Sequence, residues 1–409
     1  MQLLRKWKDN KALRATVLVM LAALALVSVI KGLQNAAEFS QDFQWDAAKA
    51  LTMRLDPYEL SLEPSRTAGI EPLDRFYRMF TDRGLKQKME ANQFPSLLML
   101  LAPMTVFSPQ AAKIVWAVLN IGFTAGIIWL LGRTFFEHSD RTDFAAVMLL
   151  MIAGTPYRNQ LGVGQHTLFA FFFFMLAVFI DRHPGDRAGL MRSAGITLCL
   201  AVSYFKYTLT APLVLYFLFR KRYREFAASV MIHVIMTAFA AVWLGKSFIY
   251  LITAPLKVAS VLASEGGIDL GVFLPQGLYA AAAVIIAALL LYLALKMPED
   301  AANLLFSILI LWSLVITYHR TYDFFVFSAA AAMFVRQYPG DIQDDKSGRR
   351  DCIMFIWYAL LMFMLCFVLR IFDENAASKL IVGITYYLFT IAATIKGVRS
   401  IKKDGSIRG

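Results

Sequence analysis

The chain has 409 residues, of which 58% are hydrophobic and 17% are charged, and its formal net charge is +12. No soluble core hides so large a share of apolar residues, so the composition excludes an ordinary soluble protein and predicts a polytopic membrane protein. The basic residues form short clusters between apolar segments, a pattern that orients a chain in a bilayer, and this argues against nucleic acid as a partner.

Apolar runs separated by charged or turn-forming residues predict an all-α membrane protein with about 12 transmembrane helices. The first run follows a basic N-terminus and has no convincing cleavage site after it, so we interpret it as a signal anchor. If the spans alternate in direction, the basic clusters all face one side, which predicts that both termini are cytoplasmic. The runs lie at residues 12–30, 111–132, 144–157, 167–180, 189–205, 206–219, 227–245, 276–296, 301–317, 324–335, 353–371 and 378–395.

The whole chain, residues 1–409, is expected to form one integral membrane domain with two long outer segments. Residues 31–93 are predicted to be the first extracytoplasmic loop, with helices that lie at the membrane interface. Residues 246–275 are predicted to be the second loop, and their glycines and mixed polarity indicate a mobile cover. The apolar segment 94–107 is too short to span and contains two prolines, so we expect a re-entrant or interfacial helix pair.

The first outer loop is predicted to begin with a short amphipathic helix. Apolar residues recur there at helical spacing, and Asp42, Asp46 and Lys49 share the opposite face. Pro57 disfavours helix at the residue before it, so the helix should end near Leu55. A second amphipathic helix is expected further along the loop. Because a carboxylate here meets water, lipid headgroups and hydrocarbon together, we interpret this stretch as the catalytic loop.

Ionisable side chains beside the apolar runs form a second informative group, because each costs roughly 2.5–3.5 kcal/mol at a helix centre on insertion. They gather at the outer ends of the predicted spans. A helix of about 21 Å separates Lys206 from Arg220, whereas the hydrocarbon layer is about 30 Å thick. We therefore expect Lys206 to lie below the outer surface, where a lipid phosphate would offset its burial. The other members of the group are Arg158, Gln165, His166, His319, Arg320 and Asp323.

Each of these residues also has a plain structural interpretation. Asp42 fits the cap of its helix, and Asp46 is expected to pair with Lys49 three residues later. Lys206 is long enough to snorkel to the interface. The segment around His319 fits an outer cluster of ion pairs, and the segment around Gly164 fits a helix break with a capping amide.

A series of short motifs extends from about residue 40 to about residue 325. They are Asp42-x-x-Trp45, the Ala47-Ala48-x-Ala50-Leu51 helix, the Leu55-Asp56-Pro57-Tyr58 turn, Pro95 with Leu101-Ala102-Pro103, Trp116 to Asn120, Gly164-Gln165, Lys206 before an apolar helix that ends at Arg220, and His319. In this order they resemble glycosyltransferase family 87, a group of membrane glycosyltransferases that use polyprenyl-phosphate sugars. Two positions depart from the family pattern and put the fit of the acceptor in doubt: Trp45 replaces the usual tyrosine, and Met53-Arg54 stands where a glycine is common.

The resemblance implies a GT-C fold and the inverting transfer of a hexosyl or pentosyl group from a polyprenyl-phosphate donor to a lipid or glycan acceptor. The reaction would take place at the extracytoplasmic face of a bacterial inner or plasma membrane. Asp42 would be the general base, with Asp46 as the alternative base. Cationic side chains would stabilise the leaving phosphate, so we expect neither a metal nor a cofactor.

The resemblance also implies two sets of contact residues. Those expected to hold the donor phosphate are Lys206, Arg158, His319 and Arg320. Those expected to bind the substrates are Gln165, His166, Tyr58 and Trp45.

Two other classes of protein remain as alternatives. A transporter or flippase for a lipid-linked sugar would keep its polar groups near the bilayer midplane, often within inverted repeats. In this sequence the polar groups lie at the outer ends of the predicted spans, and no internal repeat is visible. A non-catalytic partner of an envelope enzyme would explain the hydrophobicity but not a loop carboxylate opposite a buried lysine. The polar pattern therefore favours the enzyme.

Overall fold

The structure is a computed structural model of the chain, and it describes residues 10–63, 68–85, 89–137, 139–183, 189–262, 267–332, 345–368 and 375–405. Within these ranges every regular element is a helix, which confirms the predicted all-α class. Residues 64–67, 86–88 and 263–266 of the two predicted outer loops lie outside the described part.

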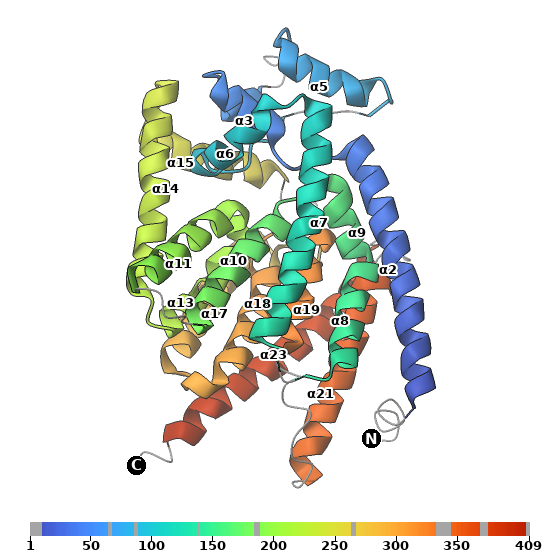
Figure 1. Cartoon of the computed structure of the whole chain (residues 1–409). Helices are drawn as coiled ribbons and strands as arrows, with labels where there is room; N and C mark the ends of the chain where they lie inside the picture. The colour runs from blue at the N-terminus through green and yellow to red at the C-terminus, as the bar shows by residue number, and fades with distance from the viewer. Residues whose placement is uncertain are drawn as a thin grey trace.

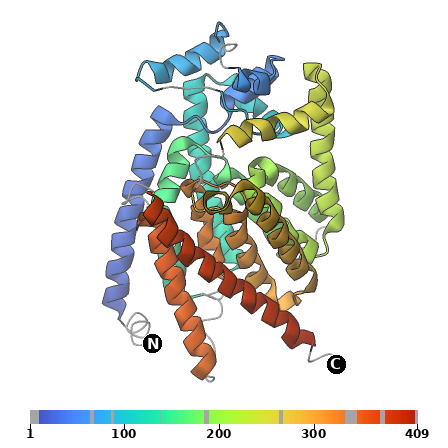
Figure 2. The same cartoon turned by 180° about the vertical axis from the view of Figure 1, so that it is seen from behind.

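The helices form a bundle with a smaller group of short helices at one end, which we call the head (Figure 1). Both ends of the chain lie at the opposite end of the bundle, as Figures 1 and 2 show from two sides. The expectation that the two termini face the same side of the membrane stays a prediction. The head consists of α3 (Trp45–Thr52), α4 (Pro57–Leu62), α5 (Glu71–Thr81), α6 (Pro95–Leu101) and η2 (Ala102–Val106).

The bundle contains fewer long helices than the sequence predicts. Seven described helices are long and apolar enough to cross a membrane, or up to eight if one bent pair counts as a span, so the predicted number of about 12 is not confirmed. Several apolar runs instead fold as short or broken helices. Outside the head the helices are α2 (Lys11–Phe39), α7 (Pro109–Thr134), α8 (Arg141–Ala153), α9 (Thr155–Val163), α10 (Thr167–Arg182), α11 (Gly189–Ser203), η3 (Tyr204–Lys206), α12 (Tyr207–Leu213), α13 (Leu215–Phe219), α14 (Tyr223–Leu244), α15 (Phe248–Leu262), α16 (Leu270–Phe273), α17 (Gln276–Lys296), η5 (Glu299–Ala301), α18 (Ala302–Ile316), η6 (Thr321–Val326), α19 (Phe327–Ala330), α21 (Asp345–Phe363), η7 (Met364–Val368) and α23 (Ala376–Gly405).

Helix α18 lies at the centre of the bundle. It is apolar around its circumference, and its residues from Leu304 to Ile316 are all buried. A helix without a polar face is stable only when other elements cover every side, and α18 packs against α12, α13, α17, α19 and α23. The residues that follow α18 are therefore also held inside the bundle, and His319 is completely buried.

The chain reverses its direction at Lys206. Arg192 near the start of α11 and Arg220 after α13 both form ion pairs with Asp181, at 3.3 and 2.8 Å. The segment between them must therefore turn round instead of crossing the bundle. The turn lies at Lys206, whose φ of −116° and ψ of 67° are not helical. Residues 189–213 qualify as one span by length and composition, but the two ion pairs show that the chain turns back between Arg192 and Arg220.

The head has an apolar core of its own, into which both predicted amphipathic helices pack. Trp45 of α3 stacks on Phe76 of α5, with ring centroids 5.6 Å apart. Asp46 accepts a hydrogen bond of 2.9 Å from the Tyr77 hydroxyl and one of 2.8 Å from the Ala47 backbone N–H. The expected pairing of Asp46 with the lysine three residues later is therefore wrong, because α5 supplies the partner instead.

Both predicted outer loops are more helical than expected. Helix α2 continues to Phe39, so it includes the first nine residues of the predicted first loop. The second loop contains α15 and α16, and it is tied to the head. The Tyr250 hydroxyl donates to Asp56 at 2.8 Å, and the Lys246 ammonium lies 3.4 Å from the same carboxylate. Segment 94–107 forms α6 and η2, which are together too short to span, as predicted.

Replacing Asp46 by asparagine tests its structural role. Burial raises the pKa of Asp46 to about 6, although the Tyr77 hydroxyl opposes the shift. A raised pKa means that the folded state holds the proton more tightly, so the contribution of Asp46 to stability is full below pH 4 and falls as the pH rises through 6. We expect the wild type to lose about 3 kcal/mol of stability relative to Asp46→Asn between pH 4 and pH 7. Unfolding in detergent at the two pH values measures this, and equal changes in both proteins would contradict it.

Candidate active site

The start of the first loop is fastened to the break between α9 and α10. The backbone N–H groups of Gln41 and Asp42 both donate to the carbonyl of Val163, at 3.3 and 3.1 Å. Gly164 ends α9 in a left-handed conformation with φ of 72°, and a β-carbon at this position would collide with the Ser40 hydroxyl. Glycine meets both demands, so the close approach of the two segments depends on it.

This approach places Gln165 beside Asp42. Helices α9 and α10 meet at 106°, and the Gln165 side chain lies at the corner. Its Nε2 donates to Asp42 Oδ2 at 3.1 Å and to the Tyr322 hydroxyl at 2.9 Å. Its Oε1 accepts from Lys206 Nζ at 3.4 Å. One amide therefore joins four segments: the start of the first loop, the α9–α10 break, η3 and η6.

Asp42 is a half-buried carboxylate that does not cap a helix. The N-cap residue of α3 is Gln44, so the interpretation of Asp42 as the cap is wrong. Burial raises the pKa of Asp42, although Gln165, Arg320 and Lys206 act in the opposite direction. A carboxylate with a raised pKa is a stronger base when it is ionised, which suits the role that the sequence suggests for it.

Lys206 belongs to a buried polar cluster. Its ammonium lies 3.2 Å from Asp323 Oδ2, and only 11% of its side chain is exposed. The same oxygen lies 2.7 Å from His319 Nδ1, and the Thr167 hydroxyl donates to the other carboxylate oxygen. Because Lys206 is held by partners inside the bundle, the interpretation that it snorkels to the interface is wrong.

His319 leaves one ring nitrogen free for a ligand. Its Nε2 is buried and has no hydrogen-bond partner among the described residues. A buried polar atom without a partner costs roughly 1–3 kcal/mol, so such an atom calls for an explanation, and a bound ligand is one. With Nδ1 directed at Asp323, the ring orientation is fixed and Nε2 is the atom that a ligand can reach.

The other two predicted cations differ in their relation to Asp42. Arg320 donates from Nε to the Tyr318 hydroxyl at 2.8 Å, and its charge acts on Asp42 directly. Arg158 lies in α9, about two turns before Gly164, with a half-buried side chain. Arg320 therefore belongs to the electrostatic surroundings of the carboxylate, whereas Arg158 lies in the helix that leads to it.

Three residues that were expected to bind substrate are buried. Trp45 is buried in the core of the head. Tyr58 is completely buried and donates its hydroxyl to the carbonyl of Gln93 at 2.8 Å. His166 is 1% exposed and packs against Trp116 and Phe205. Packing and a backbone hydrogen bond account for Tyr58, whereas the Trp45 indole nitrogen and both ring nitrogens of His166 are buried without a hydrogen-bond partner among the described residues. The assignment of the three residues to substrate binding stays a prediction.

Sequence reasoning missed two residues of the cluster. It placed Asp323 only in an outer group of ion pairs and did not connect it with Lys206, and it did not single out Tyr322. The four-residue spacing of His319 and Asp323 is a local signal for their contact, but no local signal links either residue to Lys206. Among the described residues, no group of three or more His, Cys, Asp or Glu side chains could hold a metal ion.

Comparison with known families identifies one family. The sequence model of glycosyltransferase family 87 matches residues 95–328, more than half of the chain. This range contains Gln165, Lys206, His319 and Asp323, whereas Asp42 precedes it. No curated protein and no solved structure matches the chain. On the family match, the chain is a membrane protein that belongs to glycosyltransferase family 87.

Proposed function

We propose that this glycosyltransferase moves a sugar from a polyprenyl-phosphate donor to a hydroxyl of a lipid or glycan acceptor, with inversion at the anomeric carbon. The observation that carries the proposal is the Gln165 amide, which contacts the Asp42 carboxylate on one side and the Lys206 ammonium on the other. A base for the acceptor and a cation for the leaving phosphate are the two groups that such a transfer needs. Here one small side chain separates them.

In the proposed reaction, Asp42 takes the proton of the acceptor hydroxyl while the hydroxyl oxygen forms a bond to the anomeric carbon. The bond between that carbon and the phosphate oxygen breaks, and its electron pair stays on the phosphate. Because attack comes from the face opposite the leaving group, the anomeric carbon is inverted. The products are a glycoside, a polyprenyl phosphate and a protonated Asp42, which then releases its proton to water.

The cluster around Lys206 supplies positive charge where the leaving phosphate gains negative charge. Lys206 and Arg320 provide two cations, and the Asp323 carboxylate offsets one of them. His319, when protonated, would donate from Nε2 to a phosphate oxygen while Asp323 holds Nδ1. Since Asp323 already fixes both side chains, they need little rearrangement when the donor binds, which is the condition for strong electrostatic stabilisation.

The site is proposed to face the extracytoplasmic side. Asp42 lies just before the head, and the head is at the end of the bundle opposite the termini (Figure 1). At the far end of α10, Arg192, Arg220 and Arg222 gather round Asp181. Since basic residues concentrate on the cytoplasmic side of membrane proteins, this cluster supports cytoplasmic termini and an extracytoplasmic head.

Cysteine labelling tests this orientation. In a variant without the native cysteines, Arg75→Cys in α5 and Arg224→Cys at the start of α14 are suitable positions, because both residues are exposed. An impermeant maleimide should label the two positions from opposite sides of sealed vesicles. Labelling of both from the same side would contradict the proposed topology.

The activity is tested by incubating the purified protein with a panel of radiolabelled polyprenyl-phosphate sugars and a native membrane lipid extract. We expect at least one donor to yield a labelled glycoside and free polyprenyl phosphate. The same protein in sealed vesicles addresses the flippase alternative. Movement of the intact donor across the bilayer, without loss of its sugar, would contradict the proposed transfer.

A further inference from the structure

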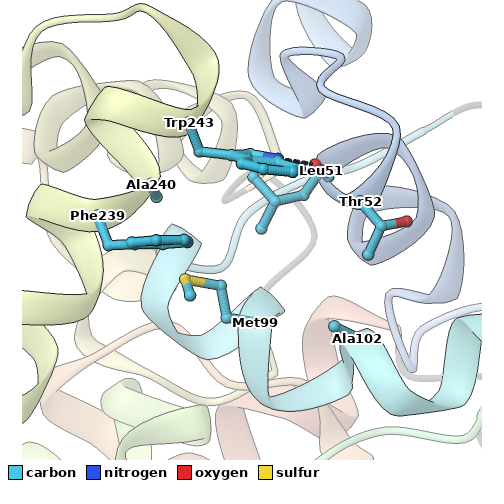
Figure 3. A pocket seen from close by; sticks show the side chains of 7 residues that line it. All are labelled: Leu51, Thr52, Met99, Ala102, Phe239, Ala240 and Trp243. Carbon is cyan, nitrogen blue, oxygen red and sulfur yellow. Dashed lines mark hydrogen bonds between the residues drawn. The ribbon is translucent and has the colours of Figure 1, made fainter.

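An apolar groove opens where the head meets α14, and Figure 3 shows its lining. Its walls come from the last turn of α3, from α6 and η2, and from α14, and it encloses about 210 Å³. All of its lining side chains except Thr52 are apolar. The Trp243 indole N–H donates to the carbonyl of Leu51 at 2.9 Å, which ties α14 to the end of α3. The groove is therefore bounded by elements that are fixed to one another.

A cation stands beside this groove. The Arg54 guanidinium lies 4.1 Å from the centre of the Trp243 ring, and the Arg54 side chain is exposed. No described residue forms a hydrogen bond or an ion pair with the guanidinium. The carboxylates nearby are already paired, since Lys246 lies 3.4 Å from Asp56 and 3.0 Å from Glu59. Arg54 therefore offers an available positive charge to a ligand of the groove.

The backbone of Arg54 ends helix α3. Its φ is 60°, in the left-handed region that glycine adopts freely and other residues adopt at a cost. The hydrogen bonds of the helix end hold this conformation, since the Arg54 N–H donates to the carbonyl of Leu51 at 3.1 Å and the Leu55 N–H donates to that of Ala50 at 2.9 Å. Glycine would be the least strained residue here, so replacing Arg54 by glycine removes the charge without disturbing the helix end.

The α14 wall of the groove belongs to an exposed apolar face. On α14, a helix apolar enough to span a membrane, Phe239 is 57% exposed and Val242 is 85% exposed. The volume of about 210 Å³ is smaller than that of most small-molecule sites, which are about 300–1,000 Å³. It fits part of one hydrocarbon chain and not a whole polar headgroup. An apolar groove with one cation at its edge matches a lipid that carries a phosphate.

We propose that this groove binds the acceptor of the transfer reaction, an anionic lipid whose chain lies against Trp243 and whose phosphate is held by Arg54. The inference rests on the proposed function, which assigns the donor phosphate to the cluster around Lys206. Arg54 is not part of that cluster and can therefore hold the phosphate of a second lipid, the acceptor. Helix α3 has 8 residues, which is about 12 Å, and it leads from the Asp42 segment to the groove. The groove therefore lies one short helix away, along the chain, from the segment that carries the base.

Photolabelling of the full-length protein in vesicles tests the site. The probes are phosphatidylglycerol and phosphatidylcholine with the same diazirine-bearing chain. Phosphatidylglycerol should label peptides that contain Met99, Phe239 or Trp243 more strongly than phosphatidylcholine does. Arg54→Gly, which relieves the backbone and should fold at least as well as the wild type, should weaken this labelling roughly 10- to 100-fold. Arg75→Ala, which removes another exposed charge of the head, should leave it unchanged.

Three results would overturn the site or its assignment. Equal labelling by the two lipids, or labelling unaffected by Arg54→Gly, would remove Arg54 from lipid binding. Displacement of the label by excess undecaprenyl phosphate would assign the groove to the donor. Ala240→Trp, which fills the groove, should abolish labelling by both lipids, and persistent labelling would show that the chain lies elsewhere.

Kinetics distinguish this inference from the proposed function. With native lipid extract as the acceptor source, Arg54→Gly should raise the amount of extract that gives half the maximal rate about tenfold or more and leave the maximal rate unchanged. An unchanged half-saturation would overturn the acceptor assignment. If the wild type transfers no sugar from any donor, the proposed function fails, whereas the labelling result still decides whether the groove binds an anionic lipid.

Discussion

Asp42→Asn is expected to reduce the rate of sugar transfer about 10²- to 10⁴-fold without unfolding the protein. Asparagine keeps the size of the side chain and an oxygen that accepts from Gln165, but it cannot take the proton of the acceptor hydroxyl. The contact between Lys206 and Asp323 is untouched, so the variant should still bind the donor lipid. Initial rates at saturating donor measure the first effect, and mass spectrometry of lipid retained by the purified variant measures the second.

The matched control is Asp46→Asn, which makes the same chemical change in the same loop. Both oxygens of Asp46 already accept hydrogen bonds, from Tyr77 and from a backbone N–H, so this variant should keep its rate within about tenfold. An inactive Asp46→Asn beside a normal Asp42→Asn would make Asp46 the base. Full activity in both variants would mean that the first outer loop is not the catalytic loop.

The pH dependence of the rate gives an independent check on Asp42. Burial raises the pKa of this carboxylate above its ordinary value of 3.8, and only the ionised form accepts a proton. The wild-type rate should therefore fall as the pH drops through the raised pKa, at a pH above 3.8. The small residual rate of Asp42→Asn should lack this acid limb. An unchanged acid limb in the variant would assign it to another group.

Lys206→Met is expected to lower the rate about 10²- to 10³-fold, because it removes the fixed positive charge that stabilises the leaving phosphate. The effect should appear in the maximal rate and in the affinity for polyprenyl phosphate. The variant also leaves the buried Asp323 carboxylate without the ammonium 3.2 Å away. Breaking a buried ion pair in this way costs roughly 3–5 kcal/mol of stability. The stability of each variant must therefore be measured, and rates compared only between samples that are folded.

The double variant Lys206→Met/Asp323→Asn separates the two effects. It removes both charges of the pair, so thermal stability should recover toward that of the wild type. Activity should stay low, since the phosphate still lacks its cation and His319 loses the carboxylate that orients it. Recovery of activity together with stability would show that Lys206 serves only to neutralise Asp323.

The class of the protein, helices α3 and α5 of the head and the family follow from the sequence alone. Long apolar runs have no stable place outside a membrane, and the spacing that predicts α3 and α5 depends only on residues a few positions apart. The same holds for the turn at Gly164, where a glycine next to a polar amide marks the break between α9 and α10. That Lys206 lies below the outer surface stays a prediction, and it rests on a helix length.

Only the tertiary structure decided the number of long helices and the partners of the polar residues. Length and hydropathy do not distinguish a helix that crosses from a segment such as Tyr204–Lys206 that turns back, because the distinction depends on where Arg192 and Arg220 meet Asp181. The partner of Asp46 came from α5, and those of Lys206 came from the α9–α10 break and from η6. Such contacts join residues that are distant in the chain, and they form because packing round α18 brings the broken ends of several helices together.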